Sequence, residues 1–175
     1  MDSAKRPPEA GTETVLRHRL TVRGIVQGVG FRPYVFRLAK HYGLNGFVKN
    51  TSLGAVIEVE GGESAVQAFE HALPTDGPPL MRVMSADIST VALENEVSFS
   101  IQESENSGNA LTWVPADVSV CKECLTETQD PGNRRYQYPF TNCTNCGPRY
   151  SIIRDVPYDR EQTTMDTFRM CELCH

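Results

Sequence analysis

VQGVGFRPY, residues 26–34, places two glycines and an arginine at the entry of an expected helix. Gly28 and Gly30 have no Cβ and tolerate positive φ, so consecutive backbone N–H groups can turn inward here. Pro33 suits the first residue of a helix, because its φ is fixed and its missing N–H has no partner there. The stretch therefore predicts an anion cradle at a helix start, to which Arg32 adds a fork of charged donors. The alternative is a plain glycine turn with a surface arginine.

Periodic patterns on both sides of this turn predict the rest of a first domain. Apolar and polar residues alternate before the turn, as in a half-buried strand, and Gly43 ends the helix that follows it. Ser64 followed by Gln67 resembles a capping box and predicts a second helix. The expected elements are a strand over 16–26, a helix over 34–42, strands at 47–48 and 55–61, a helix over 64–73, and strands over 83–91 and 97–101. Their order, β-α-β-β-α-β with one extra strand, predicts an α+β fold of the split-βαβ or ferredoxin-like kind, a sandwich of two helices on a mainly antiparallel sheet.

Asn50 is a candidate for the same site as Arg32. In this layout we expect the first strand and the strand that ends at Asn50 to be neighbours, so that Asn50 reaches the pocket of Arg32. An uncharged amide offers one acceptor and two donors, which can orient a water without repelling a phosphate. The alternative is that Asn50 only opens the turn NTSLG at residues 50–54.

Two segments, GIVQGVGFR (24–32) and GFVKNTSLG (46–54), resemble the signature segments of acylphosphatases in the same order. The resemblance implies that the first segment binds a phosphate and that Asn50 positions the attacking water, without metal or covalent intermediate. Such a site works by positioning and electrostatic stabilisation and needs no general base. The implied phosphate-binding residues are Gln27, Gly28, Val29, Gly30, Phe31 and Arg32, and the implied catalytic residues are Arg32 and Asn50.

Cysteine spacing gives a second signal in the last third of the chain. Cys121 and Cys124 form one C-x-x-C pair, and Cys143 and Cys146 form another. Two such pairs predict a tetrathiolate zinc site of the zinc-ribbon type, because each turn presents two sulfurs to one tetrahedral ion. The alternative is two reduced pairs without a metal.

A third pair, Cys171 and Cys174, offers only half of the ligands that a structural zinc site needs. We expect a partial metal site at this pair. Because CKEC and CELC are similar, we interpret it as the start of a second finger that is incomplete in this sequence.

An acylphosphatase-like segment joined to this cysteine pattern resembles the N-terminal part of the HypF carbamoyltransferases, over about residues 16–175. FRPY (31–34) and WVPADVSVCKEC (113–124) support the resemblance. It implies carbamoyl phosphate or another acyl phosphate as substrate, a structural Zn²⁺, and no cofactor for the hydrolysis itself. It also implies a HypE-type maturation protein as partner, which receives the carbamoyl group that becomes the cyanide ligand of nickel-iron hydrogenases. Only the hydrolytic module, and not full transfer activity, is expected of this chain.

The expected domain organisation has four parts. They are a disordered tail (1–14), an acylphosphatase-like domain (15–103), a linker (104–120) and a HypF-type zinc-finger region (121–175).

Composition limits the remaining classes of function. The formal net charge of −5 argues against general nucleic-acid binding. No apolar run approaches the ~20 residues of a membrane-spanning helix, and the N-terminus lacks a secretory signal. Six cysteines in such a chain fit reduced thiols in the cytoplasm. The competing hypothesis is a non-catalytic zinc-binding protein or nucleic-acid interaction module, in which the first domain is only a scaffold.

Overall fold

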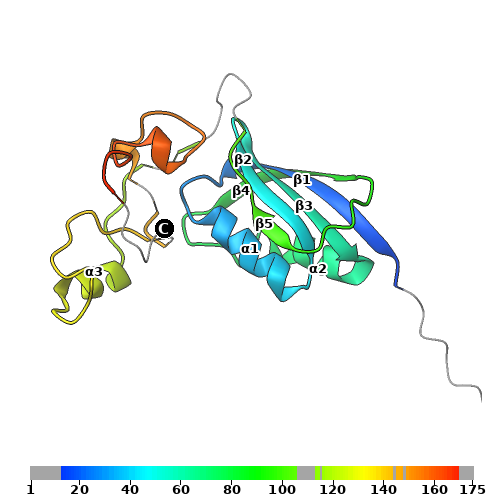
Figure 1. Ribbon diagram of the computed structural model, residues 1–175, viewed down its shortest axis with the longest axis horizontal. Coiled ribbons are helices and arrows are strands. Elements are labelled where there is room, and N and C mark those ends of the chain that lie inside the picture. Colours follow the sequence, from blue (N-terminus) through cyan, green and yellow to red (C-terminus); the bar gives the residue numbers. More distant parts are fainter. Residues whose placement is uncertain (1–12, 106–112, 115, 144, 148, 170–175) are drawn as a thin grey trace, which may run out of the picture.

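The computed structural model describes residues 13–105, 113–114, 116–143, 145–147 and 149–169. A sheet covered by two helices is followed by a C-terminal region with little regular structure (Figure 1). Residues 1–12 of the expected tail, and part of the expected linker, lie outside the described residues. The last two residues of the expected tail, Glu13 and Thr14, are described and contact the start of α2 (Glu63–Ala72). The elements are β1 (Val15–Ile25), α1 (Phe31–His41), β2 (Asn45–Thr51), β3 (Gly54–Gly62), α2 (Glu63–Ala72), β4 (Arg82–Thr90), β5 (Phe99–Ile101) and α3 (Lys122–Gln129), with 3₁₀ turns at Tyr150–Ile152 and Arg160–Gln162.

The five strands form one sheet in the order β4-β1-β3-β2-β5. Its pairings are antiparallel except that of β2 with β5, which is parallel. The expected α+β, split-βαβ arrangement is confirmed. The expected pairing of the first strand with the strand that ends at Asn50 is wrong, because β3 lies between them. The unit β1-α1-β2 leaves one place open in the sheet, and the hairpin after β2 returns β3 into that place.

One face of the sheet carries the apolar core. Helix α1 packs over β2 and β5, whereas α2 packs over β1 and β3. Leu20 of β1 and Val48 of β2 are both paired with Ile57 of β3, so alternate residues of three strands face the helices. Burial of each such side chain contributes about 1.5–3 kcal/mol. The buried cluster comprises Leu20, Val22, Val26, Val29, Phe31, Tyr34, Val35, Ala39, Leu44, Val48, Ala55, Ile57, Val59, Val66, Phe69, Leu73, Met81 and Phe99.

Helix α1 begins three residues earlier than expected. Its N-cap is Gly30, with φ of 75°, and its first residue is Phe31. Pro33 is therefore the third residue of the helix and not the first. It is still tolerated, because the first turn has no intrahelical acceptors for its N–H groups. The first hydrogen bond of the helix runs from Tyr34 N–H to the carbonyl of Gly30, at 3.1 Å.

The expected capping box of Ser64 and Gln67 is wrong. The N-cap of α2 is Gly62, and Gln67 donates instead to Glu63 within the helix. Ser64 N–H and its hydroxyl both donate to the carboxylate of Glu13, which precedes β1. A distant carboxylate thus caps the positive end of α2 in place of a local side chain.

The helices are short. Helix α1 has 11 residues, and the part of the chain that the structure describes holds no helix that is long and apolar enough to cross a bilayer.

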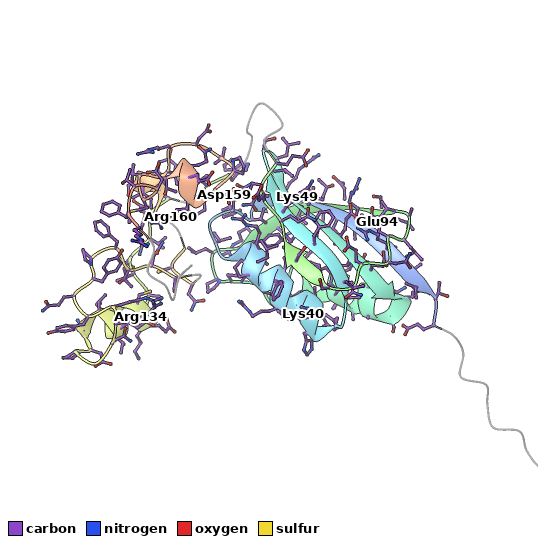
Figure 2. The ribbon with its side chains drawn as sticks, in the orientation of Figure 1. Lys40, Lys49, Glu94, Arg134, Asp159 and Arg160 are labelled. Atoms are coloured by element: carbon purple, nitrogen blue, oxygen red, sulfur yellow. The ribbon has the colours of Figure 1, made fainter. Side chains whose placement is uncertain are left out.

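The opposite face of the sheet is built around the buried cation of Arg17. The side chain of Arg17 is inaccessible to solvent and makes ion pairs with Glu58 at 2.7 Å and Glu60 at 3.0 Å, both on β3. Glu94 and Glu96, in the connection between β4 and β5, add two more carboxylates at 3.1 and 3.7 Å. The connection that carries Glu94 (Figure 2) is thereby fixed to the sheet.

The carboxylate of Glu60 is stabilised in its charged form. Burial acts to raise the pKa of Glu60, but the backbone N–H of Glu94 and the Arg17 guanidinium outweigh it and hold the pKa below its usual value. This part of the stability is present above the ordinary pKa of a glutamate and is lost as the pH falls through the lowered value.

We expect Arg17→Met to lower the free energy of unfolding by about 3–5 kcal/mol, because it leaves Glu60 buried without its cation and leaves Glu58 with only the exposed Arg19 as its partner. Urea unfolding of the full chain, followed by circular dichroism, measures the change. Arg23→Met is the matched control, since Arg23 lies on the same face of β1 and is exposed; its effect should stay within about 0.5 kcal/mol. Equal losses in the two variants would contradict the assigned role of Arg17.

Candidate functional site

The turn between β1 and α1 has the backbone geometry of an anion cradle. Gly28 and Gly30 have φ of 69° and 75°, in the left-handed region that side chains with a Cβ rarely adopt. The N-terminus of α1 has no side-chain cap. Its first N–H groups and the positive end of the helix are therefore directed at whatever lies in front of the turn.

A cavity of about 230 Å³ lies in front of this turn. Three parts of the chain form its walls: the turn itself, the end of β2, and the C-terminal region. The cavity is lined by Val26, Gly28, Gly30, Phe31, Arg32, Pro33, Asn50, Asn142, Cys143 and Tyr158. Residues far apart in the sequence thus share one small site with both polar and apolar walls.

Arg32 and Asn50, the two expected catalytic residues, lie side by side. With its amide oxygen turned toward Arg32, Asn50 accepts from Nε at 3.2 Å and from Nη2 at 3.3 Å. This orientation of the amide is assigned from hydrogen bonding, since the reverse would set donors against donors. Asn50 is 1 % exposed. Although β3 separates β1 from β2, α1 begins above the end of β2, and this brings Arg32 to Asn50.

Arg32 has further partners that the sequence did not indicate. Its Nη2 donates to Asp159 Oδ1 at 2.8 Å and to the carbonyl oxygen of Tyr158 at 3.1 Å. Its Nη1 lies 3.4 Å from the hydroxyl of Ser104. Asp159 and Tyr158 belong to an irregular segment whose pattern carries no signal for contact with a turn 126 or more positions earlier in the chain.

Gln27 joins the turn to its neighbours through a fully buried side chain. Its Nε2 donates to the carbonyls of Thr51 and Gly54, each at 2.7 Å, at the hairpin between β2 and β3. Its Oε1 accepts from the backbone N–H of Tyr158 at 2.8 Å. Val29 is also fully buried and packs in the core. These two expected phosphate-binding residues can therefore face a ligand only through their backbone.

The C-terminal region approaches the turn closely at Gly147 as well. A Cβ at Gly147 would lie 3.4 Å from the carbonyl oxygen of Gly28 and 3.0 Å from Leu80. Gly147 also has φ of 66°. A glycine is thus favoured here by its backbone conformation, and a Cβ would need only a small shift of the Leu80 side chain.

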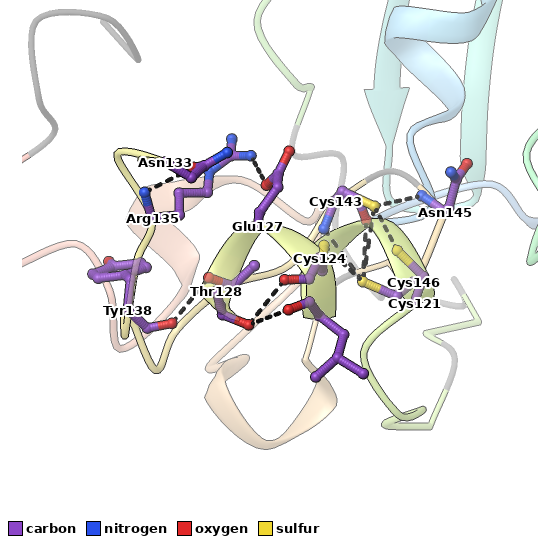
Figure 3. A network of polar contacts seen from close by, with 12 residues as sticks. Cys121, Cys124, Glu127, Thr128, Asn133, Arg135, Tyr138, Cys143, Asn145 and Cys146 are labelled. Carbon is purple, nitrogen blue, oxygen red and sulfur yellow. Dashed lines mark hydrogen bonds and ion pairs between the residues drawn. The ribbon is translucent and has the colours of Figure 1, made fainter. Parts of the chain in front are cut away.

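Four cysteines of the C-terminal region converge on one point (Figure 3). Cys121 and Cys124 flank the start of α3, and Cys143 and Cys146 come from a loop that crosses it. All four sulfur atoms lie within 4.8 Å of one another. The sulfurs of Cys121 and Cys143 are 3.4 Å apart, and those of Cys124 and Cys146 are 3.8 Å apart. A tetrahedral ion with metal–sulfur bonds of about 2.3 Å separates its ligands by about 3.8 Å, so this set suits one metal ion.

Polar groups around the cluster favour thiolate at one position. Burial acts to raise the pKa of Cys146, but backbone N–H groups of Cys121 and Cys143 outweigh it and lower this pKa to about 6. Arg149 Nη2 lies 3.7 Å from the same sulfur. Burial instead raises the pKa of Cys124 well above the usual value of a thiol. A divalent cation would supply the charge that lets all four cysteines ionise. The third pair, Cys171 and Cys174, lies outside the described residues.

Family models match both parts of the chain. The model described as Acylphosphatase matches residues 18–101, and the model described as HypF finger matches residues 120–153. The second match starts one residue before Cys121 and includes all four clustered cysteines.

Known proteins resemble the chain over different lengths. Carbamoyltransferase HypF2 of Cupriavidus necator is 46% identical over 158 residues, which is 89% of this chain and 20% of that protein. An acylphosphatase of Synechococcus sp. is 40% identical over 97 residues, which is 55% of this chain and 82% of that protein. The crystal structure of full-length HypF in the phosphate- and nucleotide-bound form is similar with a TM-score of 0.87 and 44% identity, over 94% of this chain and 22% of that one. The chain therefore spans about a fifth of the length of the HypF relatives that it matches.

We expect Gln27→Ala to destabilise the protein by about 1–3 kcal/mol, because it leaves the carbonyls of Thr51 and Gly54 and the N–H of Tyr158 without this partner. Hydrogen exchange of residues 156–159 should accelerate in the variant. Gln67→Ala, which removes an exposed glutamine from α2, is the control and should change neither quantity. Unchanged exchange at 156–159 in Gln27→Ala would show that Gln27 does not hold this segment.

Proposed function

Since the chain belongs to the acylphosphatase family, we propose that its first domain hydrolyses acyl phosphates, with carbamoyl phosphate as the substrate. With its HypF finger, the chain corresponds to the N-terminal part of the HypF carbamoyltransferases. One observation carries the proposal. Arg32 and Asn50 meet beside a glycine turn and a helix N-terminus, on the walls of one cavity. The specific substrate comes from the relatives' name, since the cavity itself would accept the phosphate of other acyl phosphates.

The phosphate of the substrate is held by the turn. Backbone N–H groups of residues 27–32 donate to its oxygens, and the start of α1 adds the positive end of its dipole. Arg32 adds charged hydrogen bonds that strengthen as negative charge redistributes over the oxygens in the transition state. These donors are fixed before the substrate arrives, so little reorganisation accompanies the reaction.

The attacking water is held by the amide of Asn50. The oxygen of the water forms a bond to phosphorus while the bond from phosphorus to the bridging oxygen breaks, and the electron pair leaves with carbamate. The protons of the water stay on the phosphate product or pass to solvent. Carbamate is a good leaving group, so no general acid is needed. The hydrogen bonds from Arg32 to Asn50 orient the amide, and the reaction gains chiefly from positioning.

The four clustered cysteines hold one Zn²⁺ in this proposal. Four protein ligands leave no position for water or substrate, so the ion is structural. It supplies the cross-link between the start of α3 and the loop of residues 143–146. Cys143 also lines the cavity, and the metal centre therefore keeps one wall of the phosphate site in place.

The full function is a step in carbamoyl transfer. The relatives are named carbamoyltransferases and extend well beyond the matched segment. We infer that the carbamate released by this module is consumed by a transfer reaction in the remaining part of such a protein. A HypE-type partner then receives the carbamoyl group for the cyanide ligand of a nickel-iron hydrogenase, in the reducing environment of the cytoplasm.

Arg32→Ala should lower kcat/KM for phosphate release from carbamoyl phosphate about 10²- to 10³-fold, because it removes a charged donor from the transition state. Asn50→Ala should lower kcat while the affinity for inorganic phosphate, measured by calorimetry, is largely kept. Arg37→Ala is the matched control, since Arg37 is an exposed arginine of the same helix. Wild-type protein that releases no phosphate would favour the scaffold hypothesis, and unchanged release in Arg32→Ala would remove Arg32 from the site.

Zinc content tests the metal centre. We expect one tightly bound zinc per chain, lost in Cys124→Ser because three thiolates bind the ion more weakly than four. Cys171→Ser, which alters only the third pair, should retain it. Elemental analysis after dialysis against a chelator measures both variants. Full zinc content in Cys124→Ser would place the ion elsewhere.

A further inference from the structure

The cation expected to bind the phosphate already has a carboxylate beside it. Asp159 Oδ1 lies 2.8 Å from Arg32 Nη2, and the carbonyl oxygen of Tyr158 lies 3.1 Å from the same nitrogen. Figure 2 shows Asp159 at the edge of the C-terminal region that faces the sheet. Neither side chain is freely solvated, since Arg32 is 22 % and Asp159 33 % exposed. Asp159 is not one of the residues that line the cavity, but it contacts Arg32 and follows Tyr158, both of which do. We call Tyr158 and Asp159 together the acidic wall.

The negative charge of Asp159 weakens the binding of phosphate in the cradle. A carboxylate within a few ångströms of a phosphate dianion repels it, and partial burial weakens the screening of this repulsion by water. Loss of Asp159 would remove this repulsion but also the ion pair that holds Arg32, so its net effect on a given acyl phosphate depends on whether part of that substrate gains from the carboxylate. The chemistry of the acyl group decides whether it does.

Carbamoyl phosphate has hydrogen-bond donors that suit the acceptors of the acidic wall. Its amino group has two N–H donors at the position where acetyl phosphate has a methyl group. The cradle holds the phosphate end, so the acyl end is directed toward the remaining walls of the cavity, which are lined by Asn50, Asn142, Cys143 and Tyr158. The Asp159 carboxylate and the Tyr158 carbonyl are acceptors on that side. A methyl or aryl group there would desolvate them without replacing their hydrogen bonds.

The wall is held in place and comes from outside the acylphosphatase match. The N–H of Tyr158 donates to the buried Gln27 at 2.8 Å, which ties the segment to the turn. The match to the acylphosphatase model ends at residue 101, whereas the HypF2 relative aligns with 89% of the chain. The segment that carries Tyr158 and Asp159 is therefore, with Asn142 and Cys143, a part of this site that lies outside the acylphosphatase match.

We propose that Asp159 is a specificity-determining residue of the acyl phosphate site, which accepts a hydrogen bond from the amino group of carbamoyl phosphate and disfavours acyl phosphates that carry an alkyl or aryl group. The inference rests on the proposed hydrolysis of acyl phosphates. A hydrogen bond to a charged acceptor at a partly exposed site corresponds to a preference of about 10- to 100-fold.

The test is the ratio of kcat/KM for carbamoyl phosphate to that for acetyl phosphate, corrected for the spontaneous decomposition of each. In Asp159→Ala we expect this ratio to fall about 10- to 100-fold, with acetyl phosphate hydrolysed as well as before or better. Asp159→Asn, which keeps an acceptor without the charge, should give an intermediate ratio. Asp166→Ala is the matched control: it removes the carboxylate of another arginine ion pair of the same region, with Arg154 at 2.9 Å, and should leave the ratio unchanged.

Two other outcomes would overturn the inference. If both substrates gain equally in Asp159→Ala, the carboxylate only competes with phosphate for Arg32. If both lose equally, Asp159 only positions Arg32. In either case the ratio stays at its wild-type value.

A binding measurement separates this inference from the proposed function. Carbamoylmethylphosphonate and 2-oxopropylphosphonate are non-hydrolysable and differ only in an amino group against a methyl group. Calorimetry should show that wild-type protein prefers the first and that Asp159→Ala has lost the preference, while inorganic phosphate binding confirms a folded site. Equal affinities in wild-type protein would overturn the inference. Absence of hydrolysis with a clear preference in binding would instead contradict the proposed activity.

Discussion

The guanidinium of Arg32 is the contact on which the site depends. One side of it faces Asn50 at the end of β2, and another faces Asp159 and the carbonyl of Tyr158. Three segments that share no secondary structure are therefore positioned by one planar cation, whose donors have fixed directions. A lysine has no such fork and could not hold these partners at once. Arg32 lines the cavity and thereby joins the glycine turn to the end of β2 and to the C-terminal region.

Two buried polar groups serve different purposes in the sheet. Arg17 neutralises carboxylates on the face opposite the helices and fixes the connection between β4 and β5. Gln27 satisfies backbone groups at the hairpin and ties down the C-terminal region. Neither contributes to the apolar core, yet each makes several hydrogen bonds. Such networks specify one arrangement because a half-satisfied version of them is costly.

Local patterns predicted the parts of the molecule that depend on local structure. Strand alternation and the glycine turn predicted the right order of elements, and two short motifs predicted that Arg32 and Asn50 lie in the same site. The C-x-x-C spacing placed four sulfurs around one point. The neighbour of β1 was predicted wrongly because periodicity says which face of a strand is buried but not which strand lies beside it. The cap of α2 by Glu13, the carboxylates around Arg17, and Asp159 depend on contacts between distant segments, for which the sequence has no local signal.

The contact between Arg32 and Asp159 also has a consequence for the order in which the site is assembled during translation. Arg32 and Asp159 are 127 positions apart in the chain, and a ribosome that adds about 5–20 residues per second makes the second about 6 to 25 s after the first. Domains of this size fold as units during synthesis, within milliseconds to seconds. The nascent sheet therefore presents its cradle to the cell before its acidic wall has been made. The last strand of the sheet ends at Ile101, so while the residues from there to Asp159 are being added, the proposed acyl phosphate site would lack its proposed specificity-determining residue.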